Sequence, residues 1–272
     1  MRPRTSCVPL LLASGALATP ALAQPVSVLA FESAPGQPPR LTLAEFDPAA
    51  QQAVPLDDPF EHASWIYGLG VHASHNYTAL APLDRDALDP SDLLDPHQAV
   101  VFGLQRHERV VSLDAATFGL LADRAGLDWE PQGDADIRVR RVEAAKVLVL
   151  PAPGAVRHPS TVATAKRGER AEIRPLMDPT TLAPEPGGIL PVRVYAEGDA
   201  VPGALVIATH LPTGTQHRVN ADNKGIAILP LDAAGAWRLE FHTLSPAPRD
   251  DPDADWVAYS ATLTFENDGG AR

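Results

Sequence analysis

Short runs of alternating apolar and polar residues, separated by turns, fill the C-terminal part of the chain. The runs cover residues 171–174, 190–195, 204–209, 216–219, 225–229, 236–241 and 257–265. Because the side chains of a strand point alternately to its two faces, Trp237 and Phe241 share one face. Glu240 and His242 then fall on the opposite, outer face. This series of short strands predicts a seven-stranded immunoglobulin-like or transthyretin-like sandwich over residues 166–268.

The earlier part of the chain is also rich in strand patterns, and it contains one helical pattern. Short apolar runs broken by proline and glycine lie at residues 26–31, 39–46, 63–72 and 137–150. Asp114 is suited to cap a helix that ends near Gly126. Phe118, Leu121 and Leu127 recur at helical spacing and would line its apolar side. The sequence therefore predicts one helix directly after Asp114.

A polar, proline-bearing stretch separates these two parts. Such composition at residues 151–168 is typical of a domain boundary. We therefore predict a mainly β protein with two β-rich domains, the first over residues 24–165 with the helix and the second over residues 166–268. Residues 269–272 are predicted to be a disordered tail.

The N-terminus has the three parts of a secretory signal peptide. Arg2 and Arg4 give a positive start, and an apolar core follows at residues 8–18. Small residues at Ala21 and Ala23 fit a cleavage site, so residues 1–23 are predicted to be removed. The mature protein would then be periplasmic or secreted. No later stretch has the length and apolar character of a transmembrane segment, and none is predicted.

Charge and cysteine content narrow the classes of partner. The formal net charge is −12, which disfavours binding to nucleic acid or to an anionic membrane. Cys7 is the only cysteine and lies in the predicted signal peptide. The mature chain would therefore contain neither a disulfide nor a thiolate.

Sequence motifs of the common catalytic sites are missing. The chain has no Gly-x-Ser-x-Gly elbow, no glycine-rich phosphate loop and no His-Glu-x-x-His pattern. We therefore predict a protein that is not an enzyme.

Histidines give the candidate metal ligands. His72 and His75 are close in sequence, and His62 precedes them. Imidazole is a common ligand for nickel, copper and zinc. Spacing by three residues would place the two rings on opposite faces of a strand, although a loop would let them converge. The alternative interpretation is that these histidines lie on the surface or are held by hydrogen bonds.

A second candidate metal site combines His242 with Asp255. The carboxylate belongs to an acidic loop that follows the histidine in sequence, and imidazole with carboxylate suits a divalent ion. The alternative is that the acidic loop is simply solvated.

Several motifs in the C-terminal part resemble a known family. They are Glu172-Ile-Arg-Pro175, Pro191-Val-Arg-Val194, Asp222-Asn-Lys-Gly225, Gly235-Ala-Trp237 and Asp255-Trp-Val-Ala-Tyr259, preceded upstream by Val111-Ser-Leu-Asp114. In order and spacing they resemble a family of exported bacterial proteins of unknown function. Its members are often described as similar to the periplasmic substrate-specific component of nickel or cobalt uptake systems. The resemblance implies a periplasmic β protein in two parts that is concerned with a transition metal.

The chain departs from this family at its mature N-terminus. Members often carry a histidine followed by an aromatic residue just after the cleavage site. Here the first histidine is His62. A metal site that depends on that end would be lost in this chain.

Together these patterns lead to one prediction and one alternative. The leading prediction is a periplasmic, non-catalytic binding protein for a divalent transition metal such as nickel or cobalt, in uptake or homeostasis. Such an ion is the one cofactor that the sequence suggests. The alternative is a protein-interaction or scaffold module of the cell envelope, whose partner is an envelope protein or transporter. A row of exposed aromatic residues would point instead to carbohydrate binding.

Overall fold

The computed structural model describes residues 26–32, 40–47, 52–55, 61–77, 93, 97–130, 136–150, 158–182 and 188–267. The described chain is mainly β with one α-helix, as the sequence predicts. The predicted signal peptide at residues 1–23 and the predicted tail at residues 269–272 lie outside the described residues. No helix in the described part is long and apolar enough to cross a membrane.

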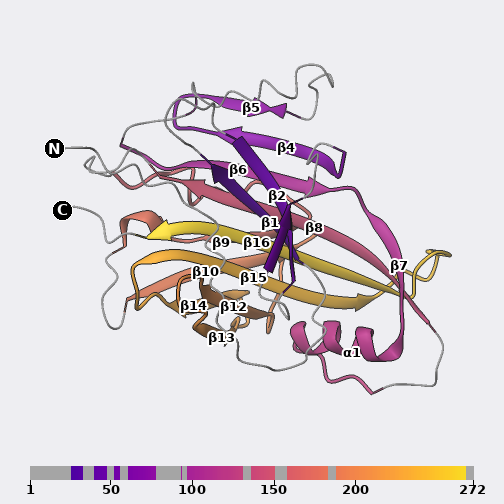
Figure 1. Cartoon of the computed structure of the whole chain (residues 1–272). Helices are drawn as coiled ribbons and strands as arrows, with labels where there is room; N and C mark the ends of the chain where they lie inside the picture. Colours follow the sequence, from indigo (N-terminus) through magenta and orange to yellow (C-terminus); the bar gives the residue numbers. More distant parts are fainter. Residues whose placement is uncertain are drawn as a thin grey trace.

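A nine-stranded sheet forms the centre of the molecule (Figure 1). Its order is β13-β12-β15-β16-β8-β6-β4-β5, and β7 also pairs with β8. The strands are β4 (Ala63–Leu69), β5 (Ser74–Asn76), β6 (Val100–Arg106), β7 (Arg109–Leu113), β8 (Ile137–Val149), β12 (Leu205–His210), β13 (Gln216–Asn220), β15 (Gly235–Pro246) and β16 (Trp256–Asn267).

The pairing of β8 with β16 joins the two predicted parts of the chain. It is parallel and runs from Trp256 opposite Val139 to Thr264 opposite Val147. The other pairings in this sheet are antiparallel. Strands from both sides of the predicted boundary near residue 165 therefore belong to one sheet.

Two smaller sheets accompany the large one. The first contains β9 (Ala171–Pro175), β10 (Ile189–Ala196), β11 (Asp199–Ala200) and β14 (Ile226–Pro230), and the second contains β1 (Val26–Glu32), β2 (Arg40–Asp47) and β3 (Gln52–Pro55). A short 3-10 helix, η3, covers Pro179–Thr181. All seven C-terminal strands predicted from the sequence are present, divided between the four-stranded sheet and the nine-stranded sheet.

The main core contains residues of both sheets. Ile173 and Val192 belong to the four-stranded sheet, which is called the small sheet below. They share one hydrophobic cluster with Trp237, Phe241 and Leu263 of the nine-stranded sheet, and all five side chains are almost completely buried. Alternation along the strands explains this packing, because one face of each sheet supplies the apolar side chains. Apolar burial of this kind is the main source of stability in a chain without disulfides.

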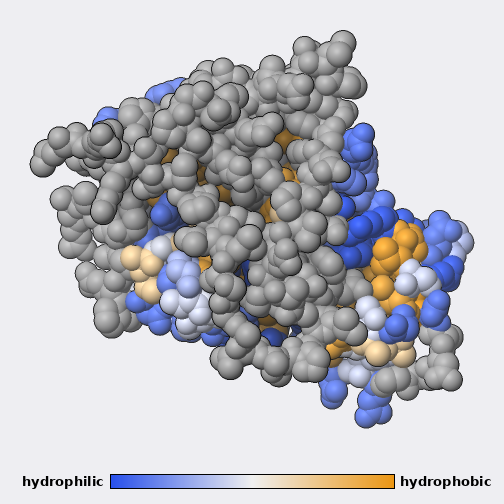
Figure 2. Space-filling view, viewed as in Figure 1, coloured by the Kyte–Doolittle hydropathy of each residue, from blue (hydrophilic) through white to orange (hydrophobic). Residues whose placement is uncertain are grey.

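The predicted helix is α1 (Ala115–Arg124). Asp114 caps it, with its Oδ1 accepting a hydrogen bond of 2.7 Å from the backbone N–H of Thr117. Phe118 and Leu121 are buried, as predicted. Leu127 is not part of the apolar side and is 36% exposed, because the helix ends three residues earlier and the chain then turns. Figure 2 shows hydrophobic residues among hydrophilic ones at this end of the molecule, over α1 and β7.

The prediction that Glu240 and His242 lie on an outer face is wrong. They are 0% and 3% exposed, because α1 and β1 pack against this face of the large sheet. Arg124 of α1 pairs with Glu240 at 2.9 Å. Figure 1 shows β1 and β2 lying across β8 and β16, and β1 contacts both of those strands. Both faces of the central strands are therefore buried.

Candidate functional site

The three histidines predicted as metal ligands lie at two ends of one strand. His62 directly precedes β4, and its backbone carbonyl accepts a hydrogen bond of 3.0 Å from the N–H of His107. His72 is exposed in the turn that follows β4, and the backbone of His75 pairs with Gly68 near the end of that strand. The length of β4 therefore separates His62 from the other two by roughly 20 Å.

Metal binding at the turn between β4 and β5 stays a prediction. The side chain of His75 lies outside the described part of the chain. Among the side chains that are described, no three histidines, aspartates or glutamates are grouped so that they could hold a metal ion.

The second predicted pair, His242 and Asp255, is not brought together. His242 lies opposite Ser260 in the middle of the sheet, so Asp255 is about 17 Å away along β16. Burial lowers the pKa of His242, which favours its neutral form. Asp255 is exposed, and hydrogen bonds from Arg138 lower the pKa of its carboxyl. His242 is therefore part of the buried interior, whereas Asp255 forms an exposed ion pair with Arg138.

A different pair of histidines lies close together. The ring centres of His97 and His158 are 5.9 Å apart, with an angle of 55° between the ring planes. Both side chains are exposed. Sequence analysis does not single out this pair, because 60 residues lie between the two and neither belongs to a motif. Only the tertiary fold shows that they are neighbours.

Buried hydrogen bonds hold the backbones that carry this pair. The N–H of His158 donates to the carbonyl of His97 at 2.8 Å. Two residues further on, the hydroxyl of Ser160 donates to the carbonyl of Ala99 at 2.8 Å, and its backbone N–H donates to Asp178 at 2.7 Å. Ser160, Ala99 and Asp178 are all buried. The two segments therefore run side by side on a fixed base, below two exposed rings.

The pair lies at the same end of the large sheet as the turn with His72. Leu69 at the end of β4 is opposite Val101 of β6, and Val100 is opposite Val149 of β8. His72 follows Leu69 in sequence and His97 precedes Val100. This end of β4, β5 and β6 is therefore rich in histidine.

Beneath the small sheet lies a buried ionic cluster of Tyr67, Lys146, Glu169 and Glu172. Lys146 Nζ is 2.9 Å from Glu172 Oε1 and 3.3 Å from Glu169 Oε2. The hydroxyl of Tyr67 donates to Glu169 at 2.9 Å. Burial raises the pKa of Glu169 to about 7, although Lys146 acts in the opposite direction. All four side chains are at most 3% exposed, so the cluster connects β4, β8 and β9 and is closed to solvent.

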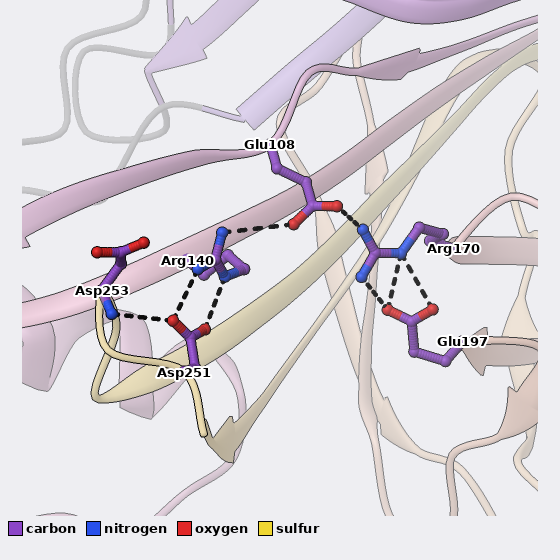
Figure 3. A network of polar contacts seen from close by, with 6 residues as sticks. All are labelled: Glu108, Arg140, Arg170, Glu197, Asp251 and Asp253. Carbon is purple, nitrogen blue, oxygen red and sulfur yellow. Dashed lines mark hydrogen bonds and ion pairs between the residues drawn. The ribbon is translucent and has the colours of Figure 1, made fainter. Parts of the chain in front are cut away.

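A second ionic network lies on the surface. Figure 3 shows its members, which are Glu108, Arg140, Arg170, Glu197, Asp251 and Asp253. Glu108 contacts both arginines, Arg140 also pairs with Asp251 at 2.8 Å, and Arg170 also pairs with Glu197. Each guanidinium thus faces two carboxylates. The network connects the β6–β7 turn to the loop between β15 and β16 and to the β10–β11 turn.

Fold and site define a β-rich protein with exposed histidines at one end of its central sheet, one buried ionic cluster and one ionic network on its surface. Residues 92–244, more than half of the chain, match the family described as a domain of unknown function, DUF4198. The chain belongs to this family. The match contains His97 and His158, and it carries no link to nickel or cobalt uptake. No curated protein and no solved structure matches the chain significantly.

Proposed function

We propose that this chain is an exported, non-catalytic binding protein for a divalent transition metal, acting in uptake or homeostasis in the periplasm. The histidine-rich end of β4, β5 and β6 is the observation that supports this function. His72, His97 and His158 are exposed there. Within the proposal, the seven C-terminal strands form an immunoglobulin-like or transthyretin-like sandwich that supports this end of the large sheet.

The chemistry of the ligands fits borderline ions. Imidazole suits copper, nickel, zinc and iron, whereas thiolate would be needed for softer ions. With Cys7 removed in the signal peptide, no thiolate remains, and imidazole nitrogen and carboxylate oxygen are the main side-chain donors. Nickel and cobalt are therefore compatible cargoes, and copper is expected to bind more tightly by the general order of divalent affinities.

The test is a titration of the purified, chelator-stripped protein with nickel, cobalt, copper and zinc. We expect micromolar or tighter binding of at least one ion by calorimetry, accompanied by a rise in Tm, because an ion that binds only the folded state stabilises it. The matched control is the same protein with a chelator in excess. The absence of both heat and thermal stabilisation with all four ions would contradict the function.

A second candidate function is an interaction module of the cell envelope, and an apolar patch on the small sheet favours it. Ile189 faces Pro230 and Ile228 faces Pro191 across β10 and β14. The two isoleucines are 52% and 54% exposed. Exposed apolar side chains that gather in one patch mark candidate contact sites.

Neighbouring charges specify the chemistry of the partner. Arg193 follows Pro191 on the same face and lies opposite Arg174 of β9. These two cations border the patch in a chain with a net charge of −12. The structure thus favours a protein segment whose apolar side chains are flanked by acidic ones.

This candidate predicts a contact that depends on apolar burial. A photo-crosslinker placed at position 189 in living cells should capture one discrete envelope protein, and Ile228→Asp should abolish that product. Leu127→Asp, at an exposed apolar site just after α1, is the control. A cross-linking pattern that Ile228→Asp leaves unchanged would exclude the patch as the contact site.

A further inference from the structure

We propose that His97 and His158 together form the primary binding site for a borderline divalent metal ion. The inference rests on the proposed function and gives it a defined site, distinct from the β4–β5 turn. The two imidazoles would supply two ligands and water the others. No residue of the sequence-predicted metal sites takes part.

The separation of the rings matches a shared ion. An imidazole nitrogen binds such ions at about 2.0–2.1 Å, which places the ring centre about 3.2 Å from the ion. Two rings on one ion then have their centres between about 4.5 Å apart at a right angle and about 6.4 Å apart in a linear arrangement. The observed 5.9 Å lies inside this range. The distance between the two rings is therefore compatible with one shared ion.

The base of the site is organised before an ion arrives. Ser160 donates to Ala99 and receives support from Asp178, so the backbones of both histidine segments are fixed by buried hydrogen bonds. Both oxygens of Asp178 already accept hydrogen bonds, one from Ser160 and the other from Thr180. Binding would thus order two side chains without the additional cost of ordering a loop.

The donor set also predicts which ions bind. Two imidazoles with solvent oxygens suit the tetragonal nitrogen and oxygen environment of Cu²⁺ or Ni²⁺. Hard ions such as Mg²⁺ and Ca²⁺ prefer oxygen ligands and should not compete. We therefore expect Cu²⁺ to bind most tightly, followed by Ni²⁺ and Zn²⁺.

The experiment titrates the chelator-stripped protein with Cu²⁺ and with Ni²⁺ by calorimetry. His97→Ala and His158→Ala should each weaken the binding at least tenfold. Electron paramagnetic resonance of the Cu²⁺ complex should show coupling to two imidazole nitrogens in the unmodified protein and to fewer in each variant. Both side chains are exposed, so the substitutions should leave the Tm of the metal-free protein unchanged.

His62→Ala combined with His107→Ala is the matched control, because these two histidines also adjoin each other, at the opposite end of β4 and β6. This variant should bind metal as the unmodified protein does. Metal binding that persists in His97→Ala and His158→Ala but is lost in His72→Ala with His75→Ala would overturn the assigned site while leaving the proposed function intact. A protein that binds neither Cu²⁺ nor Ni²⁺ would overturn both.

Discussion

Glu169 shows how burial and pairing act in opposite directions on one side chain. The carboxyl is 1% exposed, which disfavours its charged form, whereas Lys146 at 3.3 Å favours it. Lys146 is closer to Glu172, whose carboxylate also accepts from the N–H groups of Arg167 and Gly168. One cation therefore serves two carboxylates. Burial dominates at Glu169, and the pKa rises from 4.5 to about 7.

The raised pKa predicts that the contribution of Glu169 to stability is lost as the pH rises. A folded state with a pKa of about 7 at Glu169 binds its proton more tightly than the unfolded chain. The contribution is complete below about pH 4.5 and is lost as the pH rises through 7, at a cost of up to about 3 kcal/mol. Glu169→Gln cannot ionise, so it should reduce the difference in unfolding free energy between pH 5 and pH 8 by about 2 kcal/mol. Urea unfolding at both pH values measures this.

Glu130→Gln provides the control for this pH effect. Glu130 is exposed, so its substitution should leave the pH dependence of unfolding as it is in the unmodified protein. If Glu169→Gln also retained the full pH dependence, the buried cluster would not be its source.

At the level of elements, the pairing of β4 with β6 depends on one glycine beneath one ring. Gly103 lies directly opposite Tyr67, whose ring covers the place where a Cβ would stand. The hydroxyl at this same end of the ring donates a hydrogen bond to Glu169. Glycine is needed here for close approach of the ring, and the strand pair and the ionic cluster are thereby coupled.

Two substitutions of glycine by alanine should have opposite effects. Gly103→Ala would overlap the Tyr67 ring and should lower the unfolding free energy by about 3 kcal/mol. Gly119→Ala in the middle of α1 meets only ordinary contact with Trp129, at 3.7 Å, and should raise it by up to about 1 kcal/mol, because alanine favours a helix. Denaturant unfolding of both variants checks the prediction. Equal losses in the two would show that ring contact at Gly103 is not the cause.

Local sequence signals account for most of the elements. Alternation predicts the seven C-terminal strands, and the Asp114 cap with Phe118 predicts α1. Strand β6 was not predicted, because its apolar run at Val100 follows a long acidic and proline-bearing stretch and is not alternating. Periodicity also says nothing about what covers each face. It placed His242 in solvent, whereas packing against α1 and β1 buries it.

Of the candidate site, the sequence predicts only the type of residue, histidine, and not the residues that lie together. The sequence predicts histidine ligands at positions 62, 72 and 75, and metal binding there stays a prediction. The proximity of His97 to His158 depends on two irregular segments that run side by side, and a single sequence contains no signal for that contact.

At the level of the whole molecule, the parallel pairing of β8 with β16 makes the two predicted parts depend on each other. The main core contains Tyr67, Val101 and Leu148 from the first part together with strands of the second. A smaller core joins Phe118 and Val139 to Ala258. Each of these clusters contains residues from both sides of the predicted domain boundary near residue 165. Folding of either part alone would leave apolar surface and a strand edge exposed.

We therefore expect the protein to unfold in a single cooperative transition. In scanning calorimetry the measured enthalpy should equal the van't Hoff enthalpy, as for one folding unit. A fragment covering residues 166–268 alone should aggregate or lack a thermal transition, because β16 would become an edge strand without β8 beside it. Two separate transitions, with a fragment that melts at the temperature of one of them, would show instead that the two-domain division predicted from the sequence is the physical one. In that case β8 and β16 would be a contact between domains, and removing the first domain would cost the second only that contact.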